Sequence, residues 1–257
     1  MFRVCTMSLI IFGILLLPAA AQQHTSAGEL LTCAQANWNS ATFVGVMTIK
    51  AFRPDFSSEF KLQVWATENN DKAMIRVLAP QDEAGSGYLQ EGDELWFYTP
   101  AAGQVIPLPS SSLGEAFFGS DVAVEDLYRG TLNDRYTAEL LGTRTDTESG
   151  RIVHRLRLVP KPDADVVYGK LELDMFDSSC AVFQIDFFDQ RNTLIREGTF
   201  SEFAEENGLV FATHTVVNDL LREGSYTEQI VESYQIGVDI PQQRFTLECL
   251  EDEAQCG

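Results

Sequence analysis

Glu91-Gly-Asp-Glu-Leu-Trp-Phe-Tyr-Thr-Pro100, followed by Ala-Ala-Gly-Gln-Val-Ile-Pro-Leu-Pro109, is the stretch of sequence that decides the fold. A turn at Gly92-Asp93, a run of large residues from Leu95 to Tyr98 and a second turn through Gly103 predict a β-hairpin. Four consecutive bulky residues leave no face for water, so we expect this strand to be covered on both sides. The run contains no acid, base or nucleophile and therefore offers apolar surface rather than chemistry.

Alternation of apolar and polar residues extends the β pattern over most of the chain. Turn signals such as Glu68-Asn-Asn-Asp71 and Glu205-Glu-Asn-Gly208 separate the alternating runs. The pattern predicts about eleven antiparallel strands, each with one apolar and one polar face, in a sheet that curls around an interior. Trp65 is an exception, because it is a large apolar residue on a polar side. The apolar positions include Phe60, Leu62, Val64, Leu156, Leu158, Leu171, Leu173, Met175, Phe183, Ile185 and Phe187.

A helix is expected ahead of these strands, from Ala27 to Gln35, with Leu30, Leu31 and Ala34 on one side. We expect it to pack as a short lid or plug. No composition break, flexible linker or repeat divides the chain, so residues 22–257 are expected to form a single domain.

A helical interruption is expected between Leu113 and Leu127, where Asp121 is a suitable N-cap and Glu125 and Asp126 favour the early turns. Phe117-Phe118 precedes it on a glycine-flanked loop. Two interpretations remain open for these rings: they fold over the mouth of a cavity, or they plug the core of the sheet.

Residues 1–21 carry the pattern of a cleaved signal peptide. Arg3 supplies the positive charge, residues 9–17 the apolar core, and Pro18-Ala-Ala-Ala21 the small residues before the cleavage site. The apolar run is shorter than the roughly 20 residues of a membrane-spanning helix. We expect cleavage after Ala21 and an exported, periplasmic protein; an uncleaved anchor is the competing interpretation.

The acidity of the chain limits its partners. Its formal net charge is −20, and loss of Arg3 with the signal peptide makes that of the mature chain −21. Such a charge repels nucleic acids and anionic lipid head groups, so we expect neither polyphosphate partners, nucleic acid included, nor peripheral binding to a membrane. Solubility, for example in a salty habitat, is the competing explanation of the charge.

Four cysteines remain after removal of Cys5: Cys33, Cys180, Cys249 and Cys256. An even number in an exported protein predicts disulfides, with three possible connectivities. The proximity of Cys249 and Cys256 favours that pair together with Cys33–Cys180. A zinc site is the competing interpretation, but the chain has no C-x-x-C and only three histidines.

Catalytic patterns are missing from the sequence. We interpret His154 and His214 as hydrogen-bonded structural residues, because each lies on the apolar side of a strand. No G-x-S-x-G elbow, H-E-x-x-H, P-loop or Rossmann fingerprint occurs. We therefore expect a binding protein without catalytic residues, metal or cofactor; an esterase ranks behind the binding functions.

The opening stretch resembles the outer-membrane lipoprotein-sorting (LolA-like) family, whose periplasmic carrier has a D-G-x-x-L-W-F-Y-N-P hairpin. Gly119-Ser-Asp-Val-Ala-Val-Glu-Asp-Leu127 resembles a G-S-D-x-x-x-E-D-L signature in a less characterised branch of that superfamily. The likeness covers Glu29 to Phe245. Other segments that fit are Ala73–Pro80, Leu158–Pro162 and Tyr168–Lys170.

This resemblance implies a half-open antiparallel β-barrel with short helical lid segments, enclosing an apolar cavity for acyl chains. It also implies a monomeric periplasmic carrier that binds lipid or lipoprotein acyl chains for transfer towards the outer membrane, together with an inner-membrane transporter or exporter. The alternative is a lipid-sensing adaptor for a membrane exporter or a stress-signalling protein. The cavity candidates are Phe60, Leu62, Val64, Trp96, Tyr98, Phe117, Phe118, Leu156, Leu158, Leu171, Leu173, Phe183 and Phe187.

One position departs from the carrier's pattern. The carrier has an arginine directly before the proline of the preceding strand, where it ties down the lid helices, and here Ala79 precedes Pro80. Arg76 lies three residues earlier and is expected on the opposite face of the strand. The carrier's lid mechanism therefore cannot be transferred to this chain.

Overall fold

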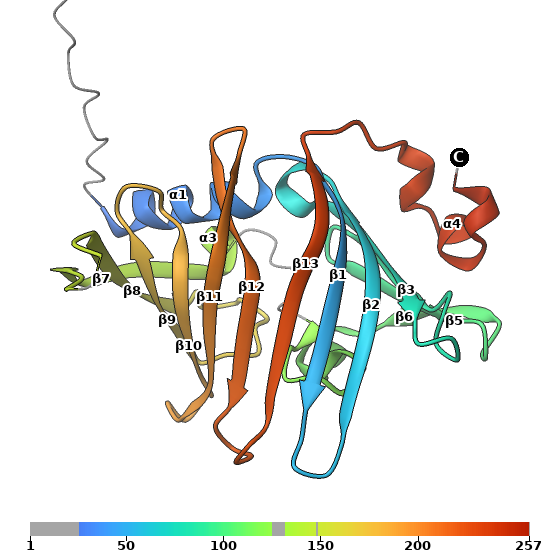
Figure 1. Cartoon of the computed structure of the whole chain (residues 1–257), viewed down its shortest axis with the longest axis horizontal. Helices are drawn as coiled ribbons and strands as arrows, with labels where there is room; N and C mark the ends of the chain where they lie inside the picture. The colour runs from blue at the N-terminus through green and yellow to red at the C-terminus, as the bar shows by residue number, and fades with distance from the viewer. Residues whose placement is uncertain (1–25, 125–131, 148, 257) are drawn as a thin grey trace, which may run out of the picture.

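The computed structural model describes residues 26–124, 132–147 and 149–256, which form one thirteen-stranded antiparallel sheet (Figure 1). The strand order is β6-β5-β4-β3-β2-β1-β13-β12-β11-β10-β9-β8-β7. The mainly β, half-open fold is confirmed, with thirteen strands in place of about eleven. The strands are β1 (Phe43–Phe52), β2 (Ser57–Ala66), β3 (Lys72–Ala79), β4 (Gly87–Glu91), β5 (Glu94–Thr99), β6 (Gln104–Leu108), β7 (Tyr136–Thr145), β8 (Ile152–Pro160), β9 (Lys170–Phe176), β10 (Val182–Phe188), β11 (Leu194–Glu206), β12 (Leu209–Asp219) and β13 (Tyr226–Ile236).

Two runs of hairpin-connected strands, β1–β6 and β7–β13, make the sheet, and the pairing of β1 with β13 joins them. The edges β6 and β7 do not pair with each other, so the sheet curls without closing. The chain between these edges is the long crossover that contains Phe117 and Asp121.

Short helices flank the sheet. Helix α1 (Ala27–Asn39) begins with a capping box between Ser26 and Glu29, which satisfies free backbone N–H groups of its first turn. The predicted helix is confirmed and continues past Gln35 to Asn39. The other helices of the described residues are α3 (Leu132–Arg135), α4 (Leu247–Glu251) and the 3-10 helices η1 (Glu68–Asn70), η2 (Ser110–Gly114), η3 (Phe117–Gly119), η4 (Gln242–Phe245) and η5 (Glu253–Gln255).

The inner face of the sheet is continuous across the two runs of strands. Residues paired across neighbouring strands point to the same face of a sheet. Leu173 is the partner of both Leu156 and Ile185, and further along the same face Val217 is the partner of Thr227. One apolar cluster on it lies beneath α1 and α3, and a second lies on β1–β5 against Phe117. Both clusters contain residues expected from the period-two pattern.

The outer face carries a third cluster, made by β3–β5 and the C-terminal segment with η4, α4 and η5. Trp65, Trp96 and Tyr98 pack against this cluster, while Leu95 and Phe97 belong to the second cluster on the inner face. Strand β5 is thus covered on both sides, as its four bulky residues predict. The same cover explains Trp65, whose apparently polar side lies under the C-terminal segment.

Both predicted disulfides, Cys33–Cys180 and Cys249–Cys256, are confirmed. The first ties α1 to the β9–β10 turn, and the second closes the C-terminal segment on itself. Residues 1–25 lie outside the described residues, so the signal peptide and its cleavage after Ala21 stay a prediction. No helix among the described residues is long and apolar enough to cross a membrane.

Candidate functional site

The predicted cavity residues separate into four groups in space. The first lies beneath α1, with every member at most 5% exposed, and comprises Leu156, Leu158, Leu171, Leu173 and Phe187. The second is the inner face of β2 together with the crossover, comprising Phe60, Leu62, Val64, Phe117 and Phe118. Trp96 and Tyr98 form the third group, on the outer face. Phe183 stands apart, stacked on Phe176 with 4.5 Å between ring centroids.

Sequence reasoning missed two inner-face aromatic residues, Tyr88 and Phe97, whose tilted rings lie 4.8 Å apart between centroids; Tyr88 also contacts Phe117. The alternation on β5 could have found Phe97, because Trp96 and Phe97 must point to opposite faces. Burial within this cluster raises the pKa of Tyr88 to about 12, and the charges of Glu115 and Glu83 add to the shift.

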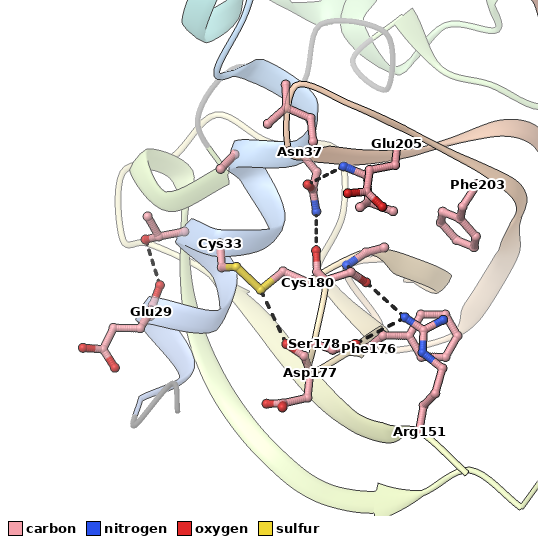
Figure 2. A pocket seen from close by; sticks show the side chains of 18 of the residues that line it. Glu29, Cys33, Asn37, Arg151, Phe176, Asp177, Ser178, Cys180, Phe203 and Glu205 are labelled. Carbon is pink, nitrogen blue, oxygen red and sulfur yellow. Dashed lines mark hydrogen bonds between the residues drawn. A yellow bond between two sulfur atoms is a disulfide. The ribbon is translucent and has the colours of Figure 1, made fainter. Parts of the chain in front are cut away.

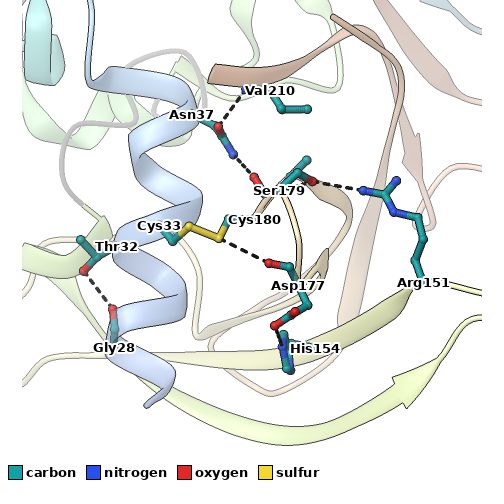
Figure 3. Close-up of a disulfide and its surroundings, with 11 residues drawn as sticks. Gly28, Thr32, Cys33, Asn37, Arg151, His154, Asp177, Ser179, Cys180 and Val210 are labelled. Atoms are coloured by element: carbon teal, nitrogen blue, oxygen red, sulfur yellow. Dashed lines mark hydrogen bonds and ion pairs between the residues drawn. A yellow bond between two sulfur atoms is a disulfide. The ribbon is translucent and has the colours of Figure 1, made fainter. Parts of the chain in front are cut away.

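Helix α1 is the first cover of the inner face. Its apolar side, Leu30, Leu31 and Ala34, is buried in the first cluster. Its polar side is attached by the Cys33–Cys180 disulfide and by Asn37 (Figure 3). Asn37 Nδ2 donates to the Ser179 carbonyl at 2.8 Å, and Asn37 Oδ1 accepts from the Val210 N–H at 2.9 Å. These contacts pin one flank of the helix to two different hairpins.

The crossover segment Phe117–Val124 is the second cover. Phe117 is fully buried, which favours its interpretation as a plug, while half-buried Phe118 stacks on Phe60 with 4.5 Å between centroids. Phe118 adopts a φ of +46°, a left-handed conformation that non-glycine residues rarely take. The second cover therefore holds two adjacent aromatic rings against the inner face.

Asp121 anchors this segment to the sheet. Its side chain is fully buried and accepts hydrogen bonds from Arg53 Nη1 at 2.7 Å and from Thr227 Oγ1 at 2.9 Å. Its backbone N–H donates to the same Thr227 hydroxyl at 2.8 Å, and Arg53 Nη2 donates to the Gly119 carbonyl at 2.8 Å. The helix expected to follow Asp121, with Glu125 and Asp126, lies outside the described residues.

A groove of about 1240 Å³ runs beside α1 (Figure 2). Its walls are the outer side of α1, the β9–β10 turn with the Cys33–Cys180 disulfide, and the β11–β12 hairpin. The Arg151 guanidinium lies 3.5 Å above the centre of the Phe176 ring and donates to Ser179 Oγ at 3.2 Å. With Phe203 nearby, the groove combines an aromatic wall, a cation and hydroxyl groups.

The two strand histidines make hydrogen bonds, as predicted. His154 is buried between Thr143 Oγ1, 2.9 Å from its Nδ1, and Asp177 Oδ1, 2.8 Å from its Nε2. His214 is half-buried, and its Nδ1 lies 3.2 Å from Ser201 Oγ. Among the described residues no three histidine, cysteine or acidic side chains are grouped as metal ligands.

Arg76 lies on the outer face and takes no part in either cover. Its Nη2 donates to the Cys249 carbonyl at 2.5 Å and its Nη1 to the Gly85 carbonyl at 3.1 Å. Burial lowers the pKa of this guanidinium. Arg76 fastens the C-terminal segment. It therefore does not replace the carrier's arginine, whose position Ala79 occupies in this chain.

Comparison with known proteins identifies relatives of this fold. A family model described as "Uncharacterized protein" matches residues 69–252. No curated protein matches the sequence.

Solved structures match closely in fold. A domain from Vibrio parahaemolyticus assigned to outer-membrane lipoprotein sorting gives a TM-score of 0.79 at 19% identity, covering 88% of this chain and 98% of that one. A DUF1329 family protein from Desulfovibrio piger gives 0.79 at 20% identity, covering 87% and 97%. A LolA superfamily protein from Nitrosomonas europaea gives 0.73 at 22% identity, covering 87% and 98%.

Proposed function

Because the chain belongs to the family whose model matches residues 69–252 and has the fold of LolA superfamily proteins, we propose that it carries lipid or lipoprotein acyl chains through the periplasm towards the outer membrane. The observation that carries this proposal is the inner face with its two apolar clusters, each under its own cover, α1 for the first and Phe117–Val124 for the second. A carrier of this kind needs binding energy and no covalent step.

The free energy of burying an acyl chain is large enough for the chain to take the place of α1 on the inner face. Each CH₂ group withdrawn from water contributes about 0.8 kcal/mol, so a chain of about 14 buried CH₂ groups gains on the order of 11 kcal/mol. That gain must offset the loss of the contacts that Leu30, Leu31 and Ala34 make with the same face. Loading therefore replaces the apolar side of α1 with an acyl chain, and unloading reverses the exchange.

The groove beside α1 is the proposed entrance. It borders the polar side of the helix, while the first cluster lies under its apolar side. The aromatic wall of Phe176 and Phe203 suits the upper part of an acyl chain. Arg151 and Ser179 suit the ester and acidic oxygens of a head group.

The export step of the proposal rests on the disulfides and on the predicted signal peptide. Disulfides form and persist in oxidising compartments such as the bacterial periplasm. Cell fractionation that finds the mature chain in the cytoplasm would contradict this part of the proposal.

The three tryptophans allow a direct test. Trp38 lies on α1 against the first cluster, while Trp65 and Trp96 lie on the outer face. Brominated fatty acids quench tryptophan fluorescence by contact, so they should quench a Trp65→Phe/Trp96→Phe protein, which keeps Trp38. They should not quench the matched Trp38→Phe/Trp65→Phe protein, which keeps Trp96. Mass spectrometry of the purified chain should also find co-purified acyl lipid. A ligand-free preparation without quenching in either variant would refute lipid carriage.

A further inference from the structure

The β1–β2 and β12–β13 hairpin tips lie next to each other at the end of the sheet away from α1 (Figure 1). Both tips expose apolar side chains. Phe56, in the β1–β2 turn, is 59% exposed, and Leu220 and Leu221, in the β12–β13 turn, are 45% and 68% exposed. We call these three residues the apolar tip. The turns lie side by side, since the Phe52 and Tyr226 rings stack with 4.5 Å between centroids at their bases.

Hydrogen bonds hold the apolar tip in place. The Arg53 N–H donates to the Phe56 carbonyl at 2.9 Å and closes the first turn. Asp219 Oδ1 accepts from the Leu221 N–H at 2.8 Å, and Asp219 Oδ2 accepts from Arg222 Nε at 2.6 Å. The hydrogen bonds of Asp219 therefore fix the turn in a conformation that leaves Leu220 and Leu221 exposed to solvent.

An arginine from each turn also pairs with Asp121, a residue of the second cover. Arg53 reaches Asp121 from the β1–β2 turn, and Arg222 Nη2 lies 3.5 Å from Asp121 Oδ1 from the β12–β13 turn. The apolar tip is thus joined to Phe117–Val124 by two ion pairs on one carboxylate. A ligand that shifts either turn also changes the anchor of the cover.

We propose that the apolar tip inserts into the interface of a zwitterionic lipid bilayer, which makes it the surface by which the proposed carrier docks on a membrane. This inference rests on the proposed lipid-carrying function and adds the docking surface. Burying three such side chains in the head-group region gives reversible association, because each contributes only a few kcal/mol at most.

The shape of the surface favours a bilayer over a protein. A stable protein interface covers about 800 Å² on each partner, far more than three side chains at two turns supply. β-Strand addition would need an unpaired edge, yet β1, β2, β12 and β13 each have strand neighbours on both sides.

The charges select the kind of lipid. Arg222 is largely exposed beside Leu221 and places a positive charge at the tip, while its Nε and Nη2 pair with Asp219 and Asp121. Exposed Asp55 and Glu223 in the same turns, together with the net charge of −20, repel an anionic surface. A zwitterionic surface accommodates both the positive and the negative side chains of the two turns.

Flotation with phosphatidylcholine vesicles tests the proposal. The mature chain should float with the vesicles, and Phe56→Ser/Leu221→Ser should reduce the bound fraction by at least about tenfold. The matched control is Leu140→Ser/Ile152→Ser, which removes side chains of similar exposure on β7 and β8 and should float like the wild type. Circular dichroism should show that all three proteins are folded.

Two outcomes would overturn the docking surface: a wild type that does not float, or a tip variant that floats as well as the wild type. Association that appears only when membrane proteins are added to the vesicles has the same consequence, because it assigns the tip to a protein. Quenching of Trp38 by brominated fatty acid, measured in solution after Trp65→Phe/Trp96→Phe is added to the same proteins, reports acyl binding separately. A failure of the docking surface is therefore distinguishable from a failure of the proposed function.

Discussion

Arg53 Nη1 lies 2.7 Å from Asp121 Oδ2, and the two side chains are 6% and 0% exposed. This pair connects a hairpin at the end of the sheet with the segment that holds Phe117 and Phe118 on the inner face. Removing both charges from water is costly, and the extra bonds to Thr227 and Gly119 offset part of that cost. The pair determines where the second cover lies, and its removal should affect both stability and ligand access.

Replacing Asp121 with Asn should lower the free energy of unfolding by about 3–5 kcal/mol, because Arg53 stays buried without its counter-charge. Urea denaturation measures the loss. Acyl-probe association should accelerate in the same variant, because the cover has lost its anchor. Lys50→Met removes a surface pair with Glu59 and should cost at most about 1 kcal/mol. Equal losses in the two variants would contradict the structural role of Asp121.

The two disulfides should differ in their contribution to stability. Cys33–Cys180 spans 147 residues and Cys249–Cys256 spans 7. Loop-closure entropy predicts a loss of about 5 kcal/mol for the first pair and about 2.5 kcal/mol for the second when each is replaced by two serines. Denaturant unfolding of the two double variants measures the ratio.

The same variants test α1 as a cover. Without Cys33–Cys180 the helix keeps only its non-covalent attachments, so acyl-probe exchange should be faster, while the Cys249→Ser/Cys256→Ser protein should exchange at the wild-type rate. Identical exchange rates in the two variants would show that α1 does not gate the inner face.

Local patterns in the sequence were sufficient for the sheet and for α1, because period-two and helical spacing record which side of an element is buried. The inner positions Leu156 and Leu173 follow directly from that rule. The contact of Arg53 with Asp121 could not be predicted, because it joins residues far apart in sequence through a crossover that has no periodic pattern. The placement of Trp96 was missed for a different reason: a cover on the outer face makes both sides of β5 apolar, and alternation then no longer distinguishes cavity from exterior.

Acid should destabilise the protein through Glu172. Burial alone would raise the pKa of this carboxyl, but hydrogen bonds from Arg155, Lys170 and Arg157 outweigh it and hold the pKa below its ordinary value of 4.5. The folded state therefore binds a proton less readily than the unfolded state. The stabilisation is present above the unfolded pKa and is lost as the pH falls through the folded pKa.

The free energy of unfolding, measured from about pH 6 down to about pH 3, should fall less steeply in Glu172→Gln than in the wild type. Glu59→Gln, on the exposed β2 surface, serves as the control and should keep the wild-type slope. Parallel curves for the wild type and Glu172→Gln would show that this carboxyl does not couple folding to pH.

Trp96 and Phe97 are adjacent residues on opposite faces of β5, so they separate ligand binding from packing. Phe97 lies in the second cluster with Tyr88 and Phe118, on the face proposed for acyl chains, and Trp96 packs under the C-terminal segment. Phe97→Ala should weaken acyl-probe binding by about tenfold, since it removes apolar contact with the chain. Trp96→Ala should leave probe affinity within about twofold and lower the free energy of unfolding by about 2–4 kcal/mol, because it opens a cavity under that segment. Probe titration and urea denaturation of both variants give the four values. A larger loss of probe affinity in Trp96→Ala than in Phe97→Ala would move the acyl site to the outer face and contradict the assignment of the inner face as the binding surface.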